Sequence, residues 1–213
     1  MKTDDLINAL SSGVEPAQRP RWRMKLAITL IAGFVVAALL VAIGLGVRPD
    51  IGTARMPIMM KAMFAALAAA IILPIAVQLM KPGRPLGWRI GAVALFVGVC
   101  AIATVTALMG EMPEQRWQAW MGGEGRAPWC VVLIPILAVP AAALLTWFMR
   151  AFSPTRITLT GAAIGALAGG VSAMAYAMYC PTDSVAFVTT WYTLAIAVCA
   201  ALGALVGSKF LRW

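Results

Sequence analysis

Six long apolar segments constrain this chain more than any other feature. Each is close to the ~20 residues that an α-helix needs to cross the ~30 Å hydrocarbon core of a bilayer. Their approximate bounds are Leu26–Val47, Ile58–Met80, Ile90–Met109, Trp129–Met149, Ile157–Tyr179 and Ala186–Val206. Short segments with Pro, Gly and charged residues, such as KPGRPLGWR and RAFSPTR, separate them and are typical of turns. The sequence therefore predicts an all-α polytopic membrane protein, a bundle of six transmembrane helices.

The distribution of Lys and Arg predicts the orientation of this bundle. If the N-terminus is cytoplasmic, twelve of the 17 basic residues lie in cytoplasmic segments and five lie outside. Basic residues in short loops are retained in the cytoplasm, so we expect both termini to be cytoplasmic. The net charge of +9 is then mostly orienting charge. It favours anionic lipid, so we expect membrane lipid as a partner and no direct contact with nucleic acid.

The chain is poor in the residues that catalysis needs. It is 62% hydrophobic and 12% charged, against roughly half and about a quarter in a soluble domain. It has no His and no CxxC pair, and no Asp or Glu falls within an expected span. We therefore expect no enzymatic activity and no cofactor. A small-solute channel or transporter stays open as an alternative, although interior polar residues are few; Lys61, near an outer helix end, is expected to snorkel to the interface.

Small residues recur on two of the expected spans. Gly161, Gly165 and Gly169 in GAAIGALAGG repeat every four residues and form one helix face. The last span has a similar series, which consists of Ala195, Cys199, Gly203 and Gly207. Such faces let two helix backbones approach closely. They predict either tight packing within one bundle or homodimerisation through a small-residue face.

The four cysteines fall into two groups by depth. Cys100 and Cys199 lie well inside the third and sixth spans, where a thiol behaves as a small hydrophobe. Cys130 and Cys180 lie at the outer ends of the fourth and fifth spans, and both would face an oxidising compartment in a bacterial inner membrane. This placement allows a disulfide or a shared site for a soft metal. A membrane thiol oxidoreductase is a further alternative, which the lack of CxxC disfavours.

Aromatic residues also gather near the outer ends of the spans. They are Trp117, Trp120, Trp129, Tyr179, Trp191 and Tyr192. Amphipathic rings settle at the headgroup level of a bilayer. We therefore expect these side chains to anchor the bundle at the interface.

The first ten residues, MKTDDLINAL, differ from everything that follows. Thr3 is suited to cap a helix, and Asp4 and Asp5 complement the dipole of its first turn. The apolar side chains form one stripe at helical spacing: Leu6, Ile7 and Leu10. A helix this short is unstable alone, so the segment is either a frayed tail or a peptide that becomes helical in the groove of a cytoplasmic partner. We expect residues 1–25 to form a cytoplasmic segment with a basic juxtamembrane stretch, and residues 26–213 to form the transmembrane domain.

Three stretches of the chain resemble the NrsF family. They are MKTDDLINAL, WCVVLIPILAVP and CPTDSVAFVTTWYTLAIAVCAALGALVGSKFLRW. Members of this family are six-span inner-membrane anti-sigma factors that restrain an extracytoplasmic-function sigma factor. The similarity covers nearly the whole chain, including the number of spans. The early segment SSGVEPAQRPR has fewer acids than the family pattern, which leaves the extent of the sigma-binding stretch open.

The resemblance implies roles for particular residues. The sigma factor would be held at the cytoplasmic N-terminal segment by Asp4, Asp5, Leu6, Ile7 and Leu10. Cys130 and Cys180 would be the thiols that sense a periplasmic stress, either an oxidant or a metal that they bind transiently. Pro135, Pro140, Trp191 and Tyr192 also fall in the family-like stretches, and we expect structural roles for them. A stress signal at the thiols would then release the sigma factor.

Overall fold

The computed structural model describes residues 3, 5, 21–81, 85–123, 127–152 and 154–210. Within these ranges all regular structure is helical, as the sequence predicts. Six helices are long and apolar enough to cross a membrane: Trp22–Leu45, Arg55–Leu79, Trp88–Gly110, Trp129–Arg150, Ile157–Tyr176 and Val185–Phe210. The expected spans are confirmed, with ends that differ by a few residues. The protein is therefore an all-α bundle with the architecture of a multi-pass membrane protein.

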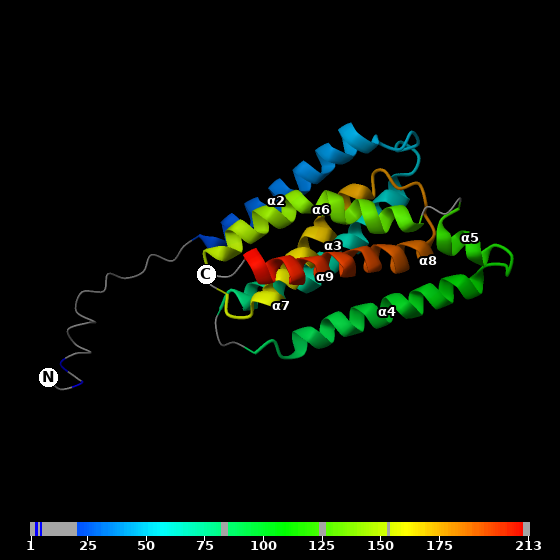
Figure 1. Cartoon of the computed structure of the whole chain (residues 1–213). Helices are drawn as coiled ribbons and strands as arrows, with labels where there is room; N and C mark the ends of the chain where they lie inside the picture. Colours follow the sequence, from blue (N-terminus) through cyan, green and yellow to red (C-terminus); the bar gives the residue numbers. More distant parts are fainter. Residues whose placement is uncertain are drawn as a thin grey trace.

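The spans are built from the following elements (Figure 1). They are α2 (Trp22–Leu40) and η1 (Val41–Leu45); α3 (Arg55–Leu79); α4 (Trp88–Gly110); the short α5 (Arg116–Met121); α6 (Ala127–Arg150); α7 (Ile157–Tyr176); and α8 (Val185–Phe187), η2 (Val188–Tyr192) and α9 (Thr193–Phe210). The elements η1 and η2 are single π-helical turns within the first and last spans. Gly46 ends η1 with φ 82°, a left-handed conformation that favours glycine.

Helix α7 lies at the centre of the bundle. Of its most apolar window, 72% is buried, whereas the figure for α4 is 6%. Figure 1 shows α4 along the edge of the bundle and α7 among the other helices. The reason lies in side-chain size, because the glycines and alanines of α7 let several neighbours approach it at once.

The small-residue faces of α7 and α9 pack against each other within one chain. A Cβ atom added to Gly165 would overlap the carbonyl oxygen of Cys199, and one added to Gly161 would overlap that of Gly203. Only glycine permits so close an approach at these positions. Of the two alternatives that the sequence leaves open, packing within one bundle therefore accounts for this face of α7, and homodimerisation remains a prediction.

The bundle has two ends that differ in content. At one end lie Trp22 and Phe210, the first residue of α2 and the last of α9; we call it the terminal end. At the opposite end lie the loop of residues 46–54, the helix α5 and the loop of residues 177–184 (Figure 1). This second end also holds Cys130 and Cys180, and we call it the thiol end.

Candidate thiol site at one end of the bundle

Cys130 and Cys180 meet at the thiol end. Cys130 lies in the first turn of α6, and Cys180 follows the end of α7 and precedes Pro181. Their exposed fractions are 1% and 2%. Both are free thiols, and they lie side by side, close enough for Cys130 to change the pKa of Cys180. The fold therefore brings together two thiols that are 50 positions apart in the sequence.

Two tyrosines line the buried side of the thiol pair. The thiol of Cys130 donates a hydrogen bond to the hydroxyl of Tyr176 over 3.4 Å. The fully buried Tyr192, carried by η2, places its hydroxyl beside the thiol of Cys180. The two rings stack in a tilted arrangement with 6.1 Å between their centroids. Because Tyr192 has no exposed surface, the expectation that it anchors the bundle at the interface is wrong; it packs against the thiols instead.

Trp120 and Trp191 also turn inward rather than forming a simple interface anchor. The indole nitrogen of Trp191 donates to the carbonyl of Trp120 over 2.8 Å, and that of Trp120 donates to Thr190 Oγ1 over 3.3 Å. These bonds fasten the short helix α5 to η2. Trp117 and Trp129 are 64% and 63% exposed, which agrees with the anchoring expectation for these two residues.

Lys61 is buried against the loop that contains Cys180. Its exposed fraction is 2%, so the expectation that it snorkels to the interface is wrong. The ammonium donates to the carbonyl of Cys180 over 2.7 Å, to that of Thr182 over 3.0 Å and to Asp183 Oδ1 over 2.7 Å. The loop that contains Cys180 folds over the start of α3 and supplies oxygen atoms that replace water around the cation.

Arg48 connects the same loop to the end of the first span. Its guanidinium donates to both carboxylate oxygens of Asp50 over 2.7 Å, and to Asp183 Oδ1 over 3.0 Å. A further bond of 3.3 Å reaches the carbonyl of Cys180, and the backbone nitrogen of Arg48 donates to the carbonyl of Met178 over 3.2 Å. Arg48 and Lys61 thus share both Asp183 and the Cys180 carbonyl. Neither residue was singled out as functional from the sequence.

The charges of this cluster stabilise one another. The hydrogen bonds that Arg48 donates to Asp50 and Asp183 raise the pKa of Arg48 above its ordinary value, although burial opposes this. Arg48 lowers the pKa of Asp50. Burial alone would raise the pKa of Asp183, but the hydrogen bonds from Arg48 and Lys61 outweigh it and lower that pKa. The neighbouring thiol of Cys130 lowers the pKa of Cys180 although burial opposes this, and the charge of Lys61 lowers it further.

The donor set restricts the chemistry of the site. Two adjacent thiols can form a disulfide, or they can offer two soft ligands to a metal ion. The described ranges contain no group of three or more His, Cys, Asp or Glu that could complete a metal site. A closed structural zinc site needs four ligands, so these two thiols do not provide one.

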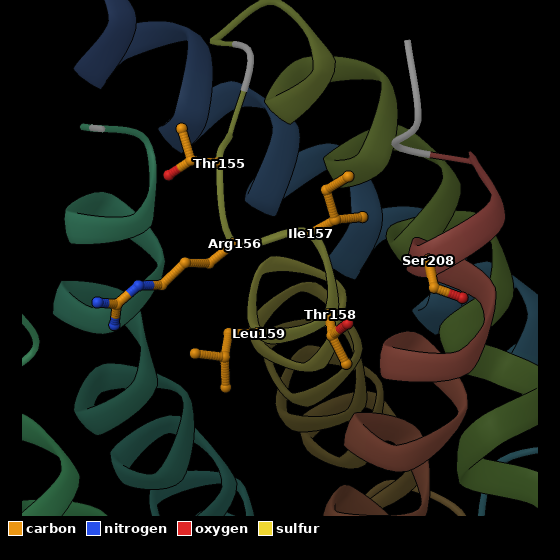
Figure 2. Close-up of a pocket in the computed structure, with 6 residues that line it drawn as sticks. All are labelled: Thr155, Arg156, Ile157, Thr158, Leu159 and Ser208. Atoms are coloured by element: carbon orange, nitrogen blue, oxygen red, sulfur yellow. The ribbon is translucent and has the colours of Figure 1, made fainter. Parts of the chain in front are cut away.

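The terminal end holds a pocket of a different kind (Figure 2). It has a volume of about 410 Å³ and is lined by Thr155, Arg156, Ile157, Thr158, Leu159 and Ser208. Figure 2 shows these side chains around the start of α7 and the end of α9. The lining has one charged group and no acid, and so lacks the paired groups of an acid–base site.

The predicted sigma-binding residues lie almost entirely outside the described ranges. Asp4, Leu6, Ile7 and Leu10 are not described. Asp5 is described and is exposed. Their role therefore stays a prediction from the sequence.

Fold and site together define a class: a six-helix polytopic membrane protein with a buried thiol pair at one end and, in the described part of the chain, no cluster that resembles a catalytic centre. Comparison with known proteins narrows this class. A family model described as "Negative regulator of sigma F" matches residues 10–213. The chain belongs to this family, NrsF.

Two relatives match along the full length of the chain. The "Probable anti-sigma-F factor NrsF" of Azospira oryzae is 36% identical over 216 residues, and the "Anti-sigma-F factor NrsF" of Caulobacter vibrioides is 34% identical over 218 residues. In both cases the match covers 100% of each chain. No solved structure matches the chain. Membership of the family confirms the resemblance seen in the sequence, and the relatives' names describe regulators rather than enzymes.

Proposed function

We propose that this chain is a membrane-bound anti-sigma factor that holds an extracytoplasmic-function sigma factor at its N-terminal segment and releases it when the Cys130–Cys180 pair senses stress. The observation that carries this proposal is the full-length similarity to two proteins named as anti-sigma-F factors. The adjacency of the two buried thiols supports the sensing part of it.

The proposal places the protein in a bacterial inner membrane with the terminal end in the cytoplasm. The distribution of basic residues supports this orientation, because it places twelve of the 17 in cytoplasmic segments, where basic residues of short loops are retained. Residues 1–25 are then the cytoplasmic segment and residues 26–213 the transmembrane domain. The thiol end faces the periplasm, where disulfides form and persist.

The N-terminal segment is proposed to bind as an amphipathic helix. Its apolar stripe, made of Leu6, Ile7 and Leu10, would enter a groove of the sigma factor, and Asp4 and Asp5 would contact basic residues at the rim. Held in this way, the sigma factor stays at the membrane, away from RNA polymerase and promoter DNA.

Two chemistries at the thiols would constitute the signal. An oxidant such as a peroxide accepts two electrons from the two thiols; the sulfur atoms form a disulfide, the O–O bond breaks, and the two thiol protons end on the reduced oxidant. Alternatively, a soft metal cation displaces both protons and binds two thiolates transiently. The disulfide draws α6 and the loop of residues 177–184 together, whereas the bridging metal holds them at a fixed separation.

Copurification from the native host tests the binding part of the proposal. The full-length protein and a form without residues 2–14 are purified in mild detergent, and associated proteins are identified by mass spectrometry. A sigma factor should accompany the full-length protein only. The double variant Leu6→Ala/Leu10→Ala should lose it, whereas Asn8→Ala, which lies off the stripe, should retain it. Equal recovery of a sigma factor with the truncated form contradicts the proposal.

A further inference from the structure

The thiol site is joined to the first span by hydrogen bonds that sequence reasoning did not anticipate. Arg48 lies three residues beyond Leu45, where that span ends, and contacts the Cys180 carbonyl, the Met178 carbonyl and Asp183. It is 7% exposed, so these contacts are shielded from water. The side chain and the backbone nitrogen of Arg48 therefore connect the end of the first span to the loop of residues 177–184.

A change at the thiols acts on the residue whose carbonyl Arg48 contacts. A disulfide has an S–S distance of about 2.05 Å, shorter than the contact distance between two unbonded thiols. Closing this distance displaces Cys180 relative to α6. The carbonyl oxygen of Cys180 belongs to the same residue and accepts hydrogen bonds from both Arg48 and Lys61. Its movement alters the bonds of both cations.

The first span offers an element that can respond. The π-turn η1 occupies Val41–Leu45 directly before Arg48 and ends at Gly46. Such turns contain one extra residue relative to an α-helix and are frequent at functional sites. A shift of the extra residue along the helix would change the register of α2 without unfolding it. A second π-turn, η2, carries Tyr192 close to Cys180.

The first span also connects Arg48 to the N-terminal segment of the chain. From Trp22 to Leu45 it has 24 residues, which at about 1.5 Å per residue gives a rod of about 36 Å. Its other end directly follows the N-terminal segment. Lys61 lies near the start of α3, and the other end of that helix leads to the loop before α4. Of the two cations, Arg48 is therefore the one on the span that continues into the N-terminal segment.

We propose that Arg48 is a positioning residue that couples the state of the Cys130–Cys180 pair to α2, and through α2 to the N-terminal segment, by its hydrogen bonds to the Cys180 carbonyl and to Asp183. This inference rests on the proposed function. It adds a structural connection between the two ends of the protein. Cys130 and Cys180 undergo the chemistry, and Arg48 transmits the resulting change to α2.

The variant Arg48→Lys tests the route. Lysine keeps the charge but cannot bridge two carboxylates and a carbonyl with one planar group. The matched control is Arg55→Lys, at the exposed start of α3. Cells are treated with the thiol oxidant diamide, and two quantities are measured: disulfide formation, by mobility shift after thiol labelling, and transcription from a sigma-dependent promoter.

The expected result is a separation of the two readouts. Arg48→Lys should form the Cys130–Cys180 disulfide as the parent does and should keep basal repression, but its induction should fall by about tenfold, within the usual range of coupling between distant sites. Arg55→Lys should resemble the parent in both readouts. Normal induction in Arg48→Lys overturns the inference, and so does loss of disulfide formation in this variant, which would place Arg48 in the thiol chemistry itself.

Two further variants keep the test decisive. If Arg48→Lys does not accumulate in the membrane, Arg48→Gln keeps a planar donor group without the charge, and the same two readouts apply. Cys130→Ser separates the two levels of the proposal. Full induction in Cys130→Ser means that thiol sensing itself fails, whereas loss of induction in Cys130→Ser together with normal induction in Arg48→Lys means that only the route through Arg48 fails.

Discussion

Lys61 and Arg48 are cations that the fold removes from water, and this is costly unless partners compensate. The described partners are carboxylates and backbone carbonyls at 2.7–3.3 Å. Removing one partner of a buried pair leaves an uncompensated charge, which is more damaging than loss of the attraction alone. The cluster therefore depends most on the acid that both cations share, Asp183.

Asp183→Asn is accordingly expected to destabilise the protein. Since the side chain of Asp183 is 34% exposed, solvent reduces the effect of a buried pair to about 1–3 kcal/mol. Asp50→Asn is the matched control, because Asp50 also contacts Arg48 but is 51% exposed and makes no contact with Lys61 in the described structure. Thermal unfolding in detergent should show a clearly larger loss for Asp183→Asn, and equal losses would contradict this account of the cluster.

The same acid predicts how stability depends on pH. The pKa of Asp183 is lower in the folded protein than in the unfolded chain, because Arg48 and Lys61 stabilise the carboxylate. Its contribution is therefore present above the unfolded value of about 3.9 and is lost as pH falls through the folded value. Unfolding measured in detergent between about pH 6 and pH 3 should show stability falling at the acidic end. The fall should be shallower in Asp183→Asn; an identical fall would mean that other groups cause it.

The two thiols predict a separation of repression from induction. Cys130→Ser and Cys180→Ser should each repress a sigma-dependent promoter like the parent, because both residues lie at the opposite end of the bundle from Trp22, where α2 begins. Each should lose the response to oxidant or metal, because one thiol alone can form neither the disulfide nor the two-ligand site. Cys100→Ser is the control, since Cys100 lies in α4 away from the pair. Reporter assays that show full induction in Cys130→Ser contradict the sensing role.

At this scale the sequence predicted residue types better than contacts. The depth of Cys130 and Cys180 in their spans was readable from the pattern, but their adjacency depends on how α6 and α7 pack. The burial of Lys61 and Arg48 could not be predicted for the same reason, because the carbonyl and the acid that both cations contact are more than a hundred positions away. The lone Lys within the apolar stretch MPIMMKAMF is the one sequence feature from which the burial of Lys61 could have been predicted.

At the scale of elements, the close packing of α7 on α9 predicts a sharp difference between glycines. Gly165→Ala places a methyl group against the Cys199 carbonyl, which belongs to the backbone and cannot move aside. We expect a loss of stability of about 1–3 kcal/mol or more. Gly98→Ala in α4 meets nothing within 4 Å and should be neutral or slightly stabilising. Thermal unfolding of the two variants in detergent checks this, and equal stability would contradict the packing of α7 on α9.

The spans themselves were predictable because length and hydropathy alone decide them. The π-turns η1 and η2 and the helix α5 were not. A π-turn differs from an α-turn by one residue, and neither segment length nor hydropathy reveals that difference. Helix α5 has six residues and is held by Trp120 and Trp191, which the sequence pattern presents only as interface anchors.

At the scale of the whole molecule, the account joins two ends of a bundle that share no direct contact. The thiol end contains the chemistry, the terminal end leads to the predicted binding segment, and the first span runs between them. The fold and the family could both be predicted from the sequence. The link between the ends was not, because it is made by side chains that meet only after the six helices have packed.

The most direct test of this account is the affinity of the protein for its sigma factor in the two thiol states. Full-length protein in lipid nanodiscs is prepared with the Cys130–Cys180 pair reduced or linked as a disulfide, and binding of the copurifying sigma factor is measured. The account predicts weaker binding in the disulfide state, by about 5-fold to 150-fold, and no difference after oxidant treatment of Cys130→Ser. Equal affinity of the reduced and disulfide-linked proteins would contradict it.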